Sequence, residues 1–398
     1  MRGRGERVIF HIDVNSAFLS WEAVDRLKKG EETDLRRVPS AVGGDVESRH
    51  GIILAKSIPA KKYGIVTGEP VTDALRKCPG LVLVPPSRGL YREMSKAFIA
   101  ILEQYSDRIE QVSIDEAFVD MTGTRRLFGE PQEAADRIRR QVFEELGFTV
   151  NVGISDNKLL AKMASDFTKP DRTHTLWPEE VPAKMWPLDV GDLLFAGRST
   201  SRRLYGLGIR TIGDLARTDP AVLAKVMGKH GGELWRAANG LGSDQVNPQR
   251  EDNKGYSHST TLPFNVTDSK EAKQILLGLT EKASARLRAD GRKTDSVGIQ
   301  IRYSDLSRVS HQMGMAAATD ITDEIYGAVC RLFEEKWDKE PIRLLGVRLQ
   351  VAAEDNGRQL DLFDQTDYEK LEKLDKAMDT IRSRYGSTAV QRASHIVK

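Results

Sequence analysis

The chain has 398 residues, and its 60 lysines and arginines nearly balance 58 aspartates and glutamates, leaving a formal net charge of +2. A hydrophobic fraction of 39% and a charged fraction of 30% exclude a largely disordered chain. No apolar run could span a bilayer, no secretory signal is visible, and two cysteines cannot build a disulfide framework or a cysteine-rich zinc site. We therefore expect a cytoplasmic protein of about two to four domains, without membrane contact.

The first part of the chain alternates apolar strands with helical patterns. Residues Val8–Ile12 predict a buried strand that ends at Asp13, and further strands are predicted at Val112–Val119 and Val150–Ile154. Helical patterns cover residues 16–29, 92–105 and 157–167. Strands separated by helices, with acidic residues inside two of the strands, predict an α+β fold that carries an active site.

The rest of the chain divides into three further parts. Short helices punctuated by glycine follow Trp186, and the polar residues 241–255 are typical of a linker. A small α/β domain of about a hundred residues comes next. After Ala353 an acidic tail precedes a helical pattern over Tyr368–Tyr385, which ends at Gly386.

Three acidic residues are candidates for metal ligands. Asp13 closes the first strand, and Asp115 and Glu116 interrupt the second. A carboxylate inside an apolar strand is costly unless it is paired or bound to metal, and Mg²⁺ prefers such oxygen ligands. Neighbouring residues in an ideal strand point to opposite faces, so a bend or twist must turn both Asp115 and Glu116 towards Asp13. The alternative is that these acids face water.

The string FHIDVNSAF, followed by SIDEAFVD, resembles the catalytic motifs of the Y-family (translesion) DNA polymerases, which include bacterial DNA polymerase IV and the UmuC-like proteins. The strings LAKSIPAKKYGI, VNVGISDNKLLAKMASDFTKP, GIRTIGDLA and QLDLF continue the resemblance in order. It implies a multidomain right-hand polymerase of the α+β class. The expected parts are a palm (1–28 and 87–176), fingers (29–86), a thumb with helix-hairpin-helix elements (177–241), a linker (242–254), a little finger (255–353) and a tail (354–398).

The resemblance also assigns roles. Asp13, Asp115 and Glu116, with the backbone carbonyl of Val14, would hold two Mg²⁺ ions while the primer 3′-hydroxyl attacks the α-phosphate of a dNTP. Phe18 would be the steric gate that rejects a 2′-hydroxyl, although a phenylalanine on a helix can simply be a core residue. The turn that leads to Ala17, and Lys169, would bind the triphosphate. Low fidelity and no proofreading are expected.

The fingers depart from the family's commonest pattern, in which Tyr-x-x-Arg contacts the triphosphate. Ile58 and Lys61 occupy these positions here. Lysine can pair with phosphate but lacks the bidentate fork of arginine. We expect Lys61 and Ser57 to contact the nucleotide, with Lys56 as a further candidate.

DNA contacts are expected from two basic segments. Residues 193–213 contain four arginines and no acid, and the family's thumb presents such Gly-rich turns to phosphate; the candidates are Gly197, Arg198, Gly206, Gly208 and Arg210. In the little finger Arg288 is the candidate, from a segment, 282–293, that carries five basic residues. A solvated helix face would look the same.

The tail resembles the peptide by which bacterial polymerases dock on the sliding clamp, with Gln359, Leu360, Leu362 and Phe363 as its contacts. The helix after it could pack on the little finger, which we favour, or meet another protein. The expected partners are primer–template DNA, dNTP and the sliding (beta) clamp, with the chain itself a monomer.

Two other functions remain open. One is a non-catalytic accessory protein that keeps the fold, the DNA contacts and the clamp peptide. The other is a different palm-type enzyme, such as a nucleotidyl cyclase, which the thumb pattern and the clamp peptide argue against.

Overall fold

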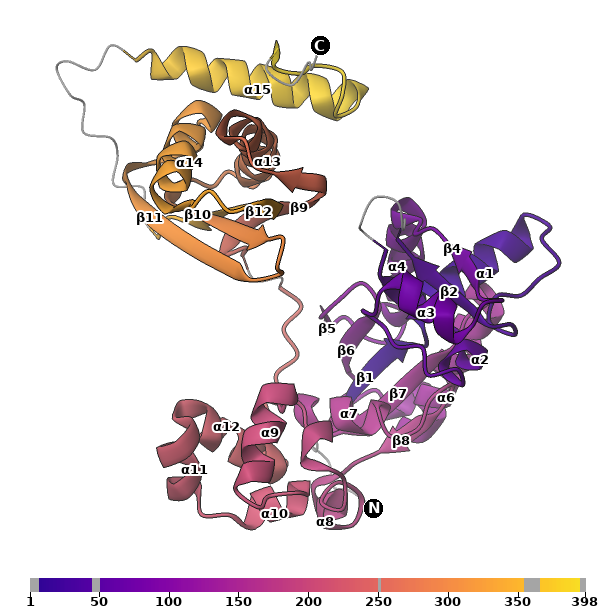
Figure 1. The fold of residues 1–398 in the computed structure, drawn as a ribbon. Coiled ribbons are helices and arrows are strands. Elements are labelled where there is room, and N and C mark those ends of the chain that lie inside the picture. Colours follow the sequence, from indigo (N-terminus) through magenta and orange to yellow (C-terminus); the bar gives the residue numbers. More distant parts are fainter. Residues whose placement is uncertain (1–6, 45–50, 250–251, 354–365, 394–398) are drawn as a thin grey trace. The chain divides into compact units, whose positions relative to one another are not determined.

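The computed structural model describes residues 7–44, 51–249, 252–353 and 366–393 of the chain. These residues form two compact units that divide in the sequence at residue 250 (Figure 1). Both units mix helices and sheets, which confirms the predicted α+β class. Within the described ranges, no helix is both long and apolar enough to cross a membrane.

A five-stranded sheet organises the first unit. Its strand order is β5-β6-β1-β7-β8, in which only β7 and β8 run parallel. The strands are β1 (Ile9–Val14), β5 (Ile109–Gln111), β6 (Glu116–Asp120), β7 (Val150–Ser155) and β8 (Thr173–Thr175). The strand that ends at Asp13 is therefore central and lies between β6 and β7.

Different helices cover the two faces of this sheet: α1 (Ala17–Lys28), α4 (Arg88–Leu102), α5 (Arg125–Phe128), α6 (Pro131–Leu146) and α7 (Lys158–Ser165). Phe10 and Ile12 of β1 belong to a core that includes residues of α1, α4 and α6. On the opposite face α7 crosses β7 so closely that a Cβ at Gly153 would come within 2.0 Å of the Ala161 carbonyl oxygen. Glycine at this position therefore permits the contact that brings α7 beside the alternate side chains of β1.

The segment expected to form the fingers is a small sheet with two short helices. The strands are β2 (Ser40–Gly43), β3 (Ile53–Lys56) and β4 (Val82–Val84), in the order β3-β2-β4. The helices are α2 (Ile58–Lys61) and α3 (Val71–Lys77). Their core, which includes Ala41, Ile53, Ala60 and Ala74, is separate from that of the large sheet.

The segment expected to form the thumb is helical throughout: η1 (Pro178–Glu180), α8 (Val181–Lys184), η2 (Val190–Asp192), α9 (Arg198–Gly206), α10 (Ile212–Arg217), α11 (Pro220–Met227) and α12 (Lys229–Ala238). The first part of the predicted linker packs against the large sheet, because Val246 is buried with Ile9 and Ala161. The first unit thus extends to residue 249, further than the predicted start of the linker at residue 242 suggests.

The second unit is a four-stranded antiparallel sheet with helices on one face (Figure 1). Its strand order is β11-β10-β12-β9, and its elements are β9 (Gly255–Val266), α13 (Ser269–Ala289), β10 (Thr294–Tyr303), β11 (Arg308–Thr319), α14 (Thr322–Lys336), β12 (Ile342–Val351) and α15 (Tyr368–Tyr385). Alternate strand residues such as Val297, Ile299, Val347 and Leu349 form one core with α13 and α14.

The last helix, α15, belongs to this unit. Asp375 is 4% exposed; its carboxylate accepts a hydrogen bond from the Thr322 N–H at 2.7 Å and so caps the start of α14. Arg288 of α13 lies 3.3 Å from Asp375 and 2.7 Å from Asp379. The expectation that this helix packs on the preceding domain is confirmed.

Candidate active site

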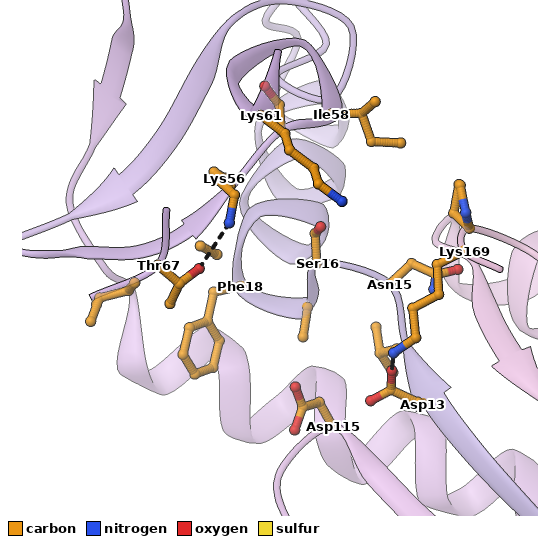
Figure 2. A pocket seen from close by; sticks show the side chains of 16 residues that line it. Asp13, Asn15, Ser16, Phe18, Lys56, Ile58, Lys61, Thr67, Asp115 and Lys169 are labelled. Atoms are coloured by element: carbon orange, nitrogen blue, oxygen red, sulfur yellow. Dashed lines mark hydrogen bonds and ion pairs between the residues drawn. The ribbon is translucent and has the colours of Figure 1, made fainter. Parts of the chain in front are cut away.

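Two cavities flank the carboxyl end of β1. The first, of about 400 Å³, is lined by residues of β1, α1, β3 and the segment around Lys169, and we call it the Asp13 cavity (Figure 2). The second, of about 690 Å³, is lined by β6, α7, α12 and the turn at Phe195, and we call it the Glu116 cavity. Both belong entirely to the first unit.

The backbone brings Asp115 to the Asp13 cavity. The Val14 N–H donates to the Asp115 carbonyl at 2.9 Å, which ties the end of β1 to the loop before β6. Ser113 Oγ donates to the Asp115 carboxylate at 2.6 Å and fixes its orientation. Asp13, Val14 and Asp115 consequently line the same cavity, as the sequence predicts.

Glu116 is the register partner of Asp13 in the β1–β6 pair, and it lines the Glu116 cavity. Lys162 Nζ lies 2.7 Å from this carboxylate and His11 Nε2 lies 3.3 Å from it. The His11 ring and the Lys162 ammonium outweigh the effect of burial and lower the pKa of Glu116 to about 2. Opposed residues of an antiparallel pair point to the same face of the sheet, so Asp13 and Glu116 lie on one face, and the charges of both act on Asp115.

The donor set suits a divalent cation. Burial, and then the negative charges of Asp13 and Glu116, raise the pKa of Asp115, so a nearby positive charge would stabilise its ionised form. Carboxylates together with the Val14 carbonyl are the hard oxygen ligands that Mg²⁺ prefers. Among the described residues, however, no three acidic, histidine or cysteine side chains are already gathered as a metal site. Lysines neutralise two of the acids instead, since Lys169 pairs with Asp13 and Lys162 with Glu116.

Phe18 forms part of the Asp13 cavity beside the buried Ala17. Its ring stacks on Tyr91, with centroids 4.6 Å apart and an interplanar angle of 14°. Tyr91 is itself fixed by a 2.6 Å hydrogen bond to the carboxylate of Glu22. The ring is thus braced from behind, as a side chain that excludes a ligand atom by contact must be.

The segment expected to form the fingers contributes two lysines to this cavity, Lys56 and Lys61 (Figure 2). Lys56 donates to Thr67 Oγ1 at 3.3 Å, and burial followed by the charge of Lys61 lowers its pKa. Lys169 comes from the opposite side of the cavity. Sequence reasoning gave Lys56 only as a substitute and missed Thr67, because neither the cavity wall nor its depth is visible in a linear pattern.

Ser57 lines the Asp13 cavity, as its predicted role requires, but its hydroxyl already has partners within the protein. Its side chain is 2% exposed, donates to the Val38 carbonyl at 2.8 Å and accepts from the Ala60 N–H at 3.1 Å as the cap of α2. The Ser40 N–H occupies it further, also at 3.1 Å. Since the Ser57 hydroxyl already makes these three hydrogen bonds, Lys56 is the better candidate for a nucleotide contact.

The predicted thumb contacts lie on an exposed surface around α9. Gly197, Arg198, Gly206, Gly208 and Arg210 are all exposed. The N–H of Gly208, whose φ is +80°, already donates to the Tyr205 carbonyl at 3.0 Å, so this glycine shapes the turn and its N–H is not free for phosphate.

In the second unit the structure argues against Arg288 as a DNA contact. Its side chain is 8% exposed and is held by Asp375 and Asp379 of α15. The helix face predicted to meet DNA is therefore partly covered by the chain's own last helix. The clamp candidates Gln359, Leu360, Leu362 and Phe363 lie outside the described residues.

The face of the sheet opposite α13 and α14 has the basic, exposed character that the sequence analysis expected of the segment 282–293. A groove of about 800 Å³ runs over the sheet, with Gly298 and Gly346 in its lining. Lys254, Arg308 and Arg348 line it together with serines and glutamines, and its lining contains no acidic residue. The signal available in the sequence was the strand alternation, which puts Gly298 and Arg348 on the face opposite the core.

Comparisons with known proteins agree with these features. Residues 12–166 match the family model described as impB/mucB/samB family, and residues 253–362 match the model of its C-terminal domain. A DNA polymerase IV from Clostridium acetobutylicum is 45% identical over 387 residues, covering 97% of this chain and 98% of that protein. DNA polymerase IV 2 from Bacillus subtilis is 38% identical and covers 98% of this chain and 95% of its own length.

Solved structures give the same picture. A Y-family DNA polymerase chimera of Dbh and Dpo4 matches with a TM-score of 0.75 and 26% identity, covering 86% of this chain and 98% of its own. DinB from Sulfolobus solfataricus matches with a TM-score of 0.55 and 26% identity, covering 86% of this chain and 98% of its own.

Proposed function

The chain belongs to the impB/mucB/samB family of Y-family DNA polymerases and is a DNA-directed DNA polymerase of the translesion class, and we propose that its reaction takes place at the paired ends of β1 and β6, between the Asp13 cavity and the Glu116 cavity. The observation that carries this proposal is the division of the three acids. Asp13 and Asp115 line one cavity, and Glu116 lines the other. Because Asp13 and Glu116 are register partners, a nucleotide in the first cavity and a primer end in the second would meet at these acids.

The Asp13 cavity would take the dNTP. Lys56, Lys61 and Lys169 supply positive charge for the triphosphate, and Phe18 lies where the sugar would rest. A lysine is a point charge without a fixed fork, so three of them can compensate for the missing arginine without reproducing its geometry. Phe18 would exclude a ribonucleotide because the ring stacked on Tyr91 cannot retreat.

The Glu116 cavity would take the end of the primer strand. Lys158 and Lys162 lie in its wall and can face the primer phosphates, while Glu116 lies beside Lys162. We assign Asp13, Asp115, Glu116 and the Val14 carbonyl to two Mg²⁺ ions. Bound there, Mg²⁺ would favour ionisation of the 3′-hydroxyl and neutralise the charge of the leaving pyrophosphate. The protein's own part is to hold the two substrates in line and keep the acids ionised.

DNA outside the active site would be held by two basic surfaces. One is the exposed surface around α9, with Arg198 and Arg210. The other is the groove on the sheet of the second unit, with Arg308 and Arg348. Because both surfaces carry arginines, the contacts would be mainly to phosphate, and binding should fall steeply with salt.

We retain the proposal that Gln359–Phe363 binds the sliding clamp, and that the protein works as a monomer. The support for the clamp is the resemblance of the peptide itself. Deleting these five residues should abolish stimulation of synthesis by the clamp and leave synthesis without the clamp unchanged. Equal stimulation of the deletion variant would remove the peptide from this role.

Primer extension on an undamaged and a lesion-containing template, with Mg²⁺ and dNTPs, tests the proposed reaction. The wild-type protein should extend both primers, and Asp115→Asn should extend neither because the variant keeps the shape but not the charge of the side chain. Asp107→Asn is a matched control, because Asp107 is an exposed acid in the same unit that lines neither cavity. If Asp115→Asn extends primers as well as the control does, Asp115 is not part of the active site.

A further inference from the structure

Phe195 has a backbone conformation that bulky residues rarely adopt. It lies in the turn between η2 and α9, and its φ angle is +74°, in the left-handed region. Most residues avoid this region because the Cβ atom crowds the following carbonyl oxygen, and glycine is the usual occupant. Holding a phenylalanine in this conformation costs free energy, and residues held in this way are concentrated at functional sites.

Packing inside the protein does not account for the ring. Phe195 is 67% exposed, whereas Leu193 and Ala196 on either side are 2% and 4% exposed and belong to the core around α9 to α12. Ser201 Oγ donates to the Ala196 carbonyl at 2.9 Å and fixes the end of the turn. The neighbours of Phe195 therefore hold the turn in place, and the exposed ring contributes little to this core.

Phe195 lines the Glu116 cavity. It comes from the turn before α9, whereas Glu116 comes from the sheet. Each acid among the residues that line this cavity has a cation beside it: Glu116 with Lys162 at 2.7 Å, Glu110 with Lys158 at 2.8 Å, and Glu233 with Lys229 at 3.8 Å. The carboxylates are thus locally balanced and do not present an uncompensated barrier to a polyanion.

The surface that continues from the ring is cationic. Residues 193–213 contain no acid and four exposed arginines, Arg198, Arg202, Arg203 and Arg210. Outside this stretch, Asp189 accepts from the Tyr205 hydroxyl at 2.5 Å and Asp214 caps α10, which leaves Asp192 as the exposed acid nearest in sequence. Arg203 donates to the Val226 carbonyl at 3.0 Å, but all four guanidinium groups belong to exposed residues. An exposed apolar ring followed in the sequence by exposed arginines matches a nucleic-acid strand, in which apolar sugar edges alternate with phosphates.

We propose that Phe195 is a DNA contact whose ring packs against a deoxyribose of the primer strand in the Glu116 cavity. The arginines of α9 neutralise the neighbouring phosphates, and the left-handed turn aims the ring into the cavity. This proposal rests on the proposed function, which assigns the primer end to the same cavity. It adds a side-chain contact by Phe195 to a turn for which the resemblance implies only phosphate contacts.

Binding of a fluorescent primer–template duplex, measured by anisotropy at several salt concentrations, tests the proposal. Phe195→Gly should weaken binding about fivefold, as loss of a modest buried apolar contact does. The slope of log affinity against log salt should not change, because no phosphate contact is lost. The midpoint of thermal unfolding should stay the same or rise, because glycine adopts the left-handed turn without strain.

Three further variants make the result specific. Arg198→Gln should lower both the affinity and the salt slope, and Phe195→Trp should bind nearly as wild type because it keeps an aromatic ring. Lys339→Gly relieves another left-handed residue, with φ of +70°, in the second unit and should leave DNA affinity unchanged.

Wild-type affinity in Phe195→Gly would overturn the proposal. A lower salt slope in Phe195→Gly would also overturn it, because the loss would then come from charge. An equal loss of affinity in Phe195→Trp would assign the loss to the backbone of the turn, and a lower unfolding midpoint in Phe195→Gly would assign it to folding; either result would overturn the proposal. A wild-type protein that binds DNA but extends no primer would instead overturn the proposed function.

Discussion

Lys169 forms an ion pair with Asp13, so that an ammonium group from the segment after α7 holds the carboxylate at the end of β1. The same ammonium lies 2.8 Å from Asp166. Burial disfavours its charge, but the two carboxylates outweigh this effect and raise the pKa of Lys169 above its ordinary value. In the proposed reaction Asp13 binds a cation and Lys169 a triphosphate. The pair must therefore separate when nucleotide and metal enter together.

Lys169→Met should change metal and nucleotide binding in opposite directions. The variant removes the competitor of the metal for Asp13, so Mn²⁺ measured by electron paramagnetic resonance without nucleotide should bind about fivefold more tightly, as expected for a partly exposed ion pair. The dNTP should bind more weakly because a phosphate contact is lost. Lys184→Met, which removes an exposed lysine paired with Glu180, should affect neither. Weaker Mn²⁺ binding in Lys169→Met would contradict the competition.

Phe18→Ala should increase the incorporation of ribonucleotides relative to deoxyribonucleotides, by about tenfold or more, because the space of the ring becomes free for a 2′-hydroxyl. Single-nucleotide insertion with dNTP and rNTP measures this ratio. Tyr91→Phe is an informative control, since it keeps the stacked ring but loses the hydrogen bond to Glu22. The gate assignment fails if Phe18→Ala keeps the wild-type ratio.

Arg288→Ala should destabilise the second unit and leave DNA affinity nearly unchanged. The substitution leaves the buried Asp375 with the Thr322 N–H and with Arg392 at 3.6 Å. Breaking such a buried pair typically costs about 3 kcal/mol. Thermal unfolding monitored by circular dichroism measures the loss. A DNA-binding defect without a loss of stability would return Arg288 to the role that the sequence predicts.

Arg348→Gln should have the opposite profile, with stability retained and DNA bound more weakly. Arg348 lines the groove on the sheet and is exposed, so one lost phosphate contact should lower the slope of log affinity against log salt by about 1. Arg331→Gln is the matched control, because Arg331 is an exposed arginine on α14, which covers the other face of the sheet. Equal effects of the two variants would argue against the groove as a DNA surface.

The contrast between Arg288 and Arg348 shows what the sequence could and could not predict. The strands and helices of this unit follow from periodicity, and the predicted α/β domain is present. Which face of the unit meets DNA depends on where α15 packs. Its contacts with Arg288 join residues that are 87 and 91 positions apart, so no local sequence pattern could predict them. The cluster of basic residues in the sequence therefore suggested α13 as a DNA-binding helix, although Arg288 is paired with Asp375 and Asp379 of α15.

The first unit gives the same lesson at shorter range. The strand patterns and the family resemblance located Asp13, Asp115 and Phe18, all of which line one cavity. They could not reveal that the Glu116 carboxylate is held by Lys162 beside His11 and lines a second cavity with them. Nor could they reveal that the Ser57 hydroxyl is spent on capping α2. Both outcomes depend on side-chain partners that only the folded chain brings together.

Single-turnover insertion of one dNTP, with rate and apparent nucleotide affinity measured separately, tests the division of the acids most directly. If Glu116 serves the primer side, Glu116→Gln should lower the maximal rate at least about a hundredfold, roughly 3 kcal/mol, while the dNTP affinity stays within about twofold. Asp115→Asn should weaken dNTP affinity as well as the rate. A Glu116→Gln protein that inserts at the wild-type rate, or that loses nucleotide affinity as Asp115→Asn does, would contradict the account.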